Sequence, residues 1–137
     1  MTDRTLLAID PGSSKCGLAL VRRDKSGNID LLWRAISARE NVVATVKESL
    51  HLAKFETIVV GSGTRSKEII KDLRDGVPGF AILVVDEKNT SLEAVERYWS
   101  HNPRKGWRRF VPATLQSPPV PVDDYVAMIL AERVLRA

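Results

Sequence analysis

The sequence predicts an α/β protein of one domain, spanning residues 1–137, with a single mixed sheet of five strands (three antiparallel, then two parallel) and helices on both faces. Three short apolar segments joined by turns open the chain, and two further apolar segments alternate with stretches of helical periodicity. A length of 137 residues suits one hydrophobic core. Hydrophobic residues make up 44% and charged residues 28% of the chain, as in globular proteins and unlike disordered ones.

The first three strands are predicted from apolar segments separated by turn residues. Residues 5–10 and 16–23 flank the Pro11-Gly12 turn, and residues 29–36 follow a Ser-Gly-Asn turn. Tight turns between consecutive strands predict an antiparallel meander.

The second half of the chain alternates helices with apolar strands. Residues 37–40 (SARE) have the spacing of a capping box, and the apolar positions after them share one helical face. Residues 57–61 (TIVVG) are a continuous apolar run, typical of a strand covered on both faces. We further expect a helix over residues 66–74, a fifth strand over 80–85, a second capping box at 90–93 (TSLE) that opens a helix to about 99, an irregular segment over 101–121 and a last helix over 123–136. Helices between the later strands imply right-handed parallel crossovers.

The N-terminal residues have no signal-peptide layout, and no apolar run approaches the ~20 residues of a membrane span, so we expect a cytoplasmic protein. The lone Cys16 excludes an intrachain disulfide and is expected to be a small core residue.

Carboxylates stand at three boundaries of the predicted elements. They are Asp10 at the end of the first strand, Asp86 and Glu87 after the fifth strand, and Asp123 and Asp124 at the start of the last helix. Because strands one and five are parallel, their carboxyl ends share one edge of the sheet, where open α/β sheets bind ligands. The alternative roles are a turn aspartate before Pro-Gly for the first and helix N-caps for the last two.

Three carboxylates brought together would repel one another, and at least one would stay protonated unless a cation held them. Carboxylates and water suit a hard divalent ion such as Mg²⁺ or Mn²⁺. Two such ions about 3.5–4 Å apart activate a water and stabilise the leaving oxygen of a phosphodiester. His51 and His101 lack the spacing of zinc ligands. The pattern therefore predicts a site for two Mg²⁺ or Mn²⁺ ions.

The positive charge is concentrated in one segment. The chain has 21 basic and 17 acidic residues, and five of the basic ones lie between residues 97 and 121 with no acid among them: Arg97, Arg104, Lys105, Arg108 and Arg109. Cations neutralise phosphates and exposed aromatics stack on unpaired bases, so this segment, with Trp107, is expected to bind nucleic acid. Lys15 on the first hairpin is expected to extend the same surface. The alternative is that Trp107 packs the segment onto the body of the protein.

Three motifs resemble one group of nucleases. LLAIDPGSSKCGLAL resembles the opening strand and turn of the RuvC and YqgF (RuvX) nucleases, members of the ribonuclease H-like superfamily. VVDEKNTSLEA is similar to the YqgF fifth-strand motif, and PVDDYVAMILAERVL resembles the closing helix. The resemblance covers nearly the whole chain, in the expected order, and implies a ribonuclease H-like fold.

The resemblance also implies roles for single residues. Asp10 matches the first metal-binding aspartate, and Glu87 matches the second position, with Asp86 as the alternative. Asp123 or Asp124 matches the last position, depending on the spacing used. Two glycines, Gly12 and Gly17, match the small residues that let the first hairpin turn close to the site.

The chain departs from both patterns. RuvC resolvases carry a glutamate at the end of the fourth strand, where this chain reads GSGT, and this difference places the chain nearer to YqgF. Lys88 stands where YqgF proteins usually have arginine, which indicates a divergent YqgF-like branch.

The resemblance implies a metal-dependent endonuclease, monomeric or homodimeric, that acts on precursor ribosomal RNA (pre-16S rRNA) or resolves branched DNA such as Holliday junctions, with RNA slightly favoured. A non-catalytic nucleic-acid-binding protein of the same fold is one alternative. A phosphate-loop ATPase of the actin or sugar-kinase type is another, because DPGSSKCG and VVGSGT look like phosphate-binding turns.

Overall fold

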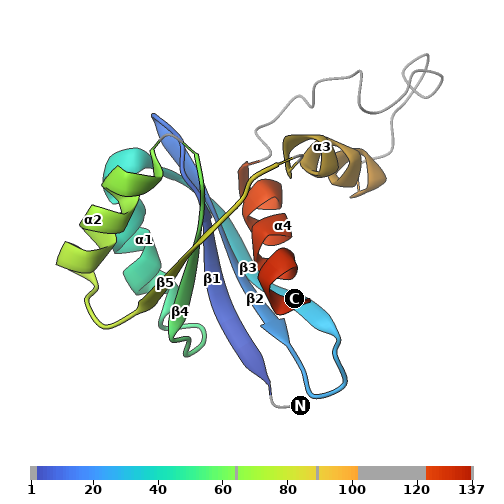
Figure 1. Ribbon diagram of the computed structural model, residues 1–137. Coiled ribbons are helices and arrows are strands. Elements are labelled where there is room, and N and C mark those ends of the chain that lie inside the picture. The colour runs from blue at the N-terminus through green and yellow to red at the C-terminus, as the bar shows by residue number, and fades with distance from the viewer. Residues whose placement is uncertain (1–2, 64, 89, 102–122, 137) are drawn as a thin grey trace.

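A mixed five-stranded sheet with helices on both faces makes up the described part of the chain (Figure 1). The computed structural model describes residues 3–63, 65–88, 90–101 and 123–136. The strands are β1 (Arg4–Asp10), β2 (Lys15–Arg23), β3 (Ile29–Ala38), β4 (Thr57–Gly61) and β5 (Ala81–Val85). The helices are the short 3-10 turn η1 (Arg39–Asn41), α1 (Val42–Ser49), α2 (Ser66–Gly76), α3 (Thr90–His101) and α4 (Asp123–Leu135).

The order of strands in the sheet is β3-β2-β1-β4-β5. β2 is antiparallel to both of its neighbours, β1 and β3, whereas β4 is parallel to both β1 and β5. This confirms the predicted sheet. β1, β4 and β5 therefore finish at one edge, which we call the carboxyl edge: the edge where β1 ends at Asp10, β4 at Gly61 and β5 at Val85.

β1 is buried from both sides because helices cover each face of the sheet. Leu6 and Ala8 belong to a hydrophobic cluster formed with α3 and α4, and Leu7 and Ile9 belong to a second cluster formed with α1 and α2. Successive side chains of a strand point to opposite faces, so a strand between two helical layers must be apolar at nearly every position. The sequence of β1 meets this requirement up to Asp10.

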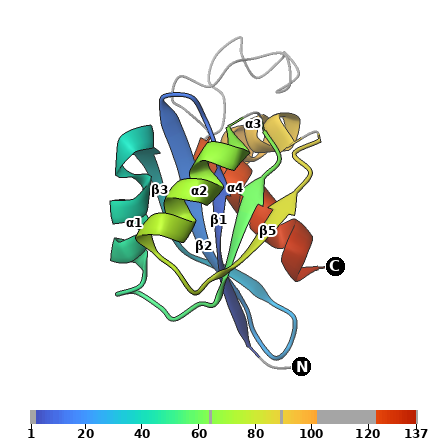
Figure 2. The same cartoon turned by 60° about the vertical axis from the view of Figure 1, so that its left-hand side comes forward.

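α4 lies across β1 and β2, with α3 packed against it, while α1 and α2 lie on the other face (Figure 2). The buried residues of α4 are Tyr125, Val126, Ala127, Ile129, Leu130, Ala131 and Leu135. Cys16 is buried in the α1/α2 cluster, which confirms its predicted core role. Among the described helices, none combines the length and the apolar character that crossing a bilayer requires.

At both predicted capping boxes, the first residue contacts groups other than those that a capping box would pair with it. β3 continues to Ala38, so Ser37 lies in a strand, where its hydroxyl lies 3.0 Å from the hydroxyl of Thr45, and α1 begins only at Val42. At the start of α3, the N–H and hydroxyl of Thr90 both donate to the carbonyl oxygen of Glu87, at 3.0 and 2.7 Å. The groups that a capping box would pair with each other thus have other partners.

Truncation of Leu130 to alanine tests the α4 interface. Its side chain is fully buried between α4 and the sheet, so we expect Leu130→Ala to lower the free energy of unfolding by about 2–5 kcal/mol. Leu92→Ala is the matched control, because Leu92 on α3 is 52% exposed. Equal losses for the two variants in urea unfolding would contradict this packing.

Candidate active site at the carboxyl edge

Asp10 and Gly61 are neighbours at the carboxyl edge. The parallel pairing of β1 with β4 places Ile9 beside Val60, and the next residues along the two strands are Asp10 and Gly61. Asp10 has the same parity along β1 as Ala8, which faces α4, and Gly61 has the same parity along β4 as Val59, which also faces α4. Adjacent strands lie about 4.8 Å apart. Both positions therefore face the α4 side, one strand spacing apart.

The Glu87 carboxylate lies directly over Gly61. A Cβ atom added to Gly61 would lie 2.0 Å from Oε1 of Glu87, and one added to Gly63 would lie 3.1 Å from Oε2. The Glu87 N–H also donates to the hydroxyl of Ser62 at 3.4 Å. The carboxylate thus takes the space that side chains at positions 61 and 63 would need. Because Gly61 lies beside Asp10, the register brings the Glu87 and Asp10 carboxylates to the same part of the edge.

The two oxygens of the Glu87 carboxylate differ in their surroundings from those of its neighbour Asp86. Its Oε1 is buried and accepts no hydrogen bond from any residue that the structure describes. A buried acceptor without a partner costs about 1–3 kcal/mol, and more when it is charged. The carboxylate of Asp86, by contrast, is exposed and accepts a hydrogen bond from the N–H of Lys88 at 3.0 Å. Glu87 therefore stays the candidate ligand in this turn, with Asp86 as the alternative.

The Asp124 carboxylate faces β3. Its Oδ2 lies 3.5 Å from Nε of Arg34, whose guanidinium carbon lies 4.7 Å from the ring centre of Tyr125. A hydrogen bond with Tyr125 and the charge of Asp124 raise the pKa of the Arg34 guanidinium above its ordinary value. β3 is two strands away from β1 in the sheet, so the partner of this ion pair comes from a strand other than those that end at Asp10 and before Glu87.

No set of three or more His, Cys, Asp or Glu side chains within the described ranges is close enough to hold a metal ion. Asp10, Glu87 and Asp124 thus do not form the three-carboxylate cluster that we expected. Asp123 is the first residue of α4, and its side chain lies outside the description. The third ligand therefore stays a prediction, with Asp123 as the remaining candidate.

The turn of the first hairpin is tight at Gly12. A Cβ atom added to Gly12 would lie 2.1 Å from the carbonyl oxygen of Lys15, so only glycine fits this turn. Gly17 is buried and pairs with Asp10 across β1 and β2. Lys15 is exposed at the start of β2. The other predicted nucleic-acid contacts lie outside the described residues: Arg104, Lys105, Trp107, Arg108 and Arg109.

No protein-family model matches the sequence, and a comparison with curated proteins finds no match either. Solved structures do match. Thermus thermophilus RuvC has a TM-score of 0.58 and 16% sequence identity, over 93% of this chain and 90% of RuvC. The T. thermophilus RuvC complex with a Holliday junction substrate has a TM-score of 0.56 and 17% identity over the same shares. The fold is ribonuclease H-like.

A member of the Ppx/GppA family from Aquifex aeolicus also matches, with a TM-score of 0.43 and 15% identity over 74% of this chain. The chain spans less than half of that protein, 42% of its length. At 16–17% sequence identity, the similarity to RuvC establishes the fold alone.

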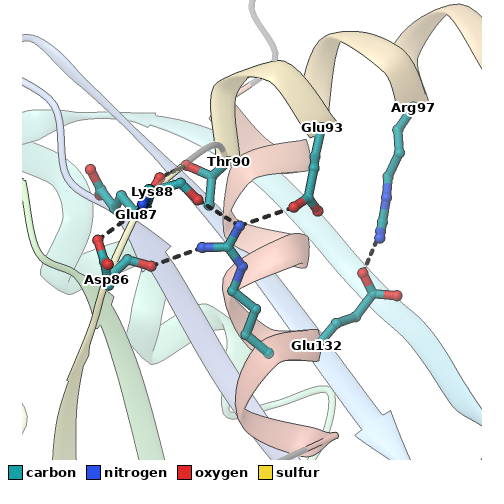
Figure 3. Close-up of polar contacts among 8 residues, drawn as sticks. Asp86, Glu87, Lys88, Thr90, Glu93, Arg97 and Glu132 are labelled. Carbon is teal, nitrogen blue, oxygen red and sulfur yellow. Dashed lines mark hydrogen bonds and ion pairs between the residues drawn. The ribbon is translucent and has the colours of Figure 1, made fainter.

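Arg133 is a residue that no motif or spacing in the sequence singles out. From the last turn of α4 it donates to the carbonyl oxygens of Asp86 and Lys88, at 3.0 and 2.7 Å, and to Oε1 of Glu93 at 3.0 Å (Figure 3). In the sequence, an arginine at a helix C-terminus is an ordinary surface residue. Only the tertiary structure places it behind the turn that holds Glu87.

The close approach of Glu87 to Gly61 is testable by a double-mutant cycle. All three atoms nearest to a Cβ at position 61 belong to Glu87, so Gly61→Ala forces this side chain to move, but has no such effect once Glu87→Ala has removed it. We expect the two substitutions to be non-additive in unfolding free energy, with a coupling of about 0.5–3 kcal/mol.

Gly63→Ala is a milder version of the same test, because its Cβ would lie 3.1 Å from the Glu87 carboxylate. Its coupling with Glu87→Ala should therefore be smaller than that of Gly61→Ala. Additivity of Gly61→Ala with Glu87→Ala would show that the carboxylate lies elsewhere.

Proposed function

We propose that this protein is a divalent-metal-dependent nuclease that hydrolyses phosphodiester bonds in structured nucleic acid. The observation that supports this most directly is the Glu87 carboxylate, held over Gly61 beside Asp10 with one buried oxygen that has no partner among the described residues. T. thermophilus RuvC, whose fold is similar, has been solved with a Holliday junction substrate. A similar fold and paired carboxylates at the carboxyl edge make the same class of substrate a reasonable proposal here.

Two of the three carboxylates that a Mg²⁺ or Mn²⁺ site would use lie in the described part of the carboxyl edge. Asp10 and Glu87 supply oxygen ligands at one place on the edge, and we assign the third position to Asp123 because Asp124 is paired with Arg34. Bound divalent ions would activate the attacking water and stabilise the leaving oxygen. The protein's own part is to fix the two carboxylates: β1 holds Asp10 in the centre of the sheet, and the glycines of β4 leave room for Glu87.

The substrate class follows from charge. The chain has a net charge of +4, and its surplus lies between residues 97 and 121, which comprise the end of α3 and most of the connection to α4. Lys15 adds an exposed cation at the first hairpin. Cations near a carboxylate site offset its repulsion of a polyanion and hold the phosphates. Precursor ribosomal RNA and branched DNA both meet this description, and a substrate panel distinguishes them.

A non-catalytic nucleic-acid-binding protein is the second candidate function. The observation that favours it is the lack of a three-carboxylate group in the part of the chain that the structure covers. This protein would bind the same substrates and leave them intact in Mg²⁺ and in Mn²⁺.

Removal of one carboxylate tests the proposal. With labelled four-way DNA junctions and precursor rRNA fragments, we expect cleavage in Mg²⁺ or Mn²⁺, and loss of at least 100-fold in rate for Asp10→Asn and for Glu87→Gln with substrate binding retained. Both variants should stay folded, since each removes a charge from a site of like charges. Cleavage that persists in EDTA, or equally in Asp10→Asn, would reject the metal mechanism.

The pair Asp123→Asn and Asp124→Asn provides an internal comparison in the same assay. We expect the larger loss of cleavage for Asp123→Asn, because the Asp124 carboxylate already has a cationic partner. The reverse order would assign the metal to Asp124. Binding of every substrate without cleavage by the wild type would favour the second candidate function.

The salt dependence of binding tests the basic segment. If Arg108 and Arg109 contact phosphates, the double variant Arg108→Ala/Arg109→Ala should flatten the log–log salt slope by between about one and two units, since each contact contributes roughly 0.7–0.9. Lys47→Ala/Lys54→Ala is the control, because both lysines are exposed on the α1 side of the sheet. An unchanged slope for the arginine variant would place the interface elsewhere.

A further inference from the structure

The turn after β5 is held from behind by one guanidinium. Arg133 donates through Nη1 to the carbonyl oxygen of Asp86 and through Nη2 to that of Lys88, the residues on either side of Glu87. The carbonyl of Glu87 itself accepts two hydrogen bonds from Thr90. Three consecutive carbonyls of the turn are therefore occupied, and the backbone of Glu87 has little freedom to rotate.

Arg133 orients the turn that bears Glu87 without neutralising the charge of the Glu87 carboxylate. Arg133 touches main-chain oxygens beside Glu87, whereas the Glu87 carboxylate keeps its buried Oε1 without a partner among the described residues. An arginine paired with the carboxylate itself would compete with a metal ion for the same oxygens. The charge of Arg133 is balanced on its other side by Glu93, whose Oε1 lies 3.0 Å from Nη2. The turn is thus fixed without adding net positive charge next to the carboxylate.

A planar guanidinium is suited to this task. Its donors form a fixed fork that reaches two carbonyls and a carboxylate together, which the single ammonium of lysine does less well. Arg133 is 29% exposed, so most of its side chain is covered by the protein.

We propose that Arg133 is a positioning residue that sets the metal affinity of the site by fixing the turn that bears Glu87. This inference rests on the proposed function, since it requires a cation at Glu87. Groups that orient a metal ligand typically affect affinity by 10–100-fold when they are removed.

The test measures Mn²⁺ affinity from the metal-dependent rise in melting temperature of the full chain, because a ligand of the folded state stabilises it by mass action. We expect Arg133→Met to weaken Mn²⁺ binding about 10-fold or more and Arg133→Lys to weaken it less. Glu132→Gln is the matched control: Glu132 adjoins Arg133 and pairs with Arg97 across α3 and α4, away from the Glu87 turn (Figure 3). Its melting temperature should fall while its Mn²⁺ affinity stays that of the wild type.

A second measurement needs no metal and uses the conservative variant Arg133→Lys. Amide hydrogen exchange at Thr90, whose N–H donates to the Glu87 carbonyl, should be faster in Arg133→Lys than in Glu132→Gln. Wild-type Mn²⁺ affinity in folded Arg133→Met or Arg133→Lys would overturn the inference, as would unchanged exchange at Thr90. A wild type that shows no response to Mn²⁺ would instead reject the proposed function.

Discussion

Parallel pairing of β4 with both β1 and β5 brings the ends of three strands to one edge of the sheet, and the position of each candidate ligand follows from it. A shift of one residue between β1 and β4 would turn Asp10 or Gly61 to the opposite face. Packing prevents this shift, because the residues preceding Asp10 alternate between two hydrophobic clusters. The apolar cores on both faces thus determine where the charged groups lie.

Two arginines act on the carboxylates of this region in different ways. Arg34 pairs with the side chain of Asp124, and a pairing of this kind satisfies the carboxylate. Arg133 contacts the main chain around Glu87, and this leaves the carboxylate to other ligands. Burying a carboxylate without a partner is costly, so the fold tolerates it where surrounding contacts hold the backbone firmly. This contrast is the physical reason why we propose Glu87 before Asp124 as a ligand.

The sequence was sufficient to predict the sheet and the edge, because strand periodicity and turn residues are local properties, and Asp10 interrupts the most regular apolar run. The contacts at the ends of helices were not predictable: Ser37 and Thr90 have capping sequences, but their hydroxyls bond to groups outside a cap. Gly61 seemed to lack an expected carboxylate, and only the structure places Glu87 over it. Arg133 lies 46 residues from Glu87 in the chain, a separation that no spacing rule connects.

β5 is the last strand of the sheet, with β4 as its one neighbour, and Leu83 and Val84 on it are 42% and 55% exposed. Short edge strands open locally at a smaller free energy than the whole domain. Fraying of β5 would withdraw Glu87 while Asp10, on the central strand, stayed in place. The proposed site would then lose its geometry as a local event, below the temperature at which the core melts.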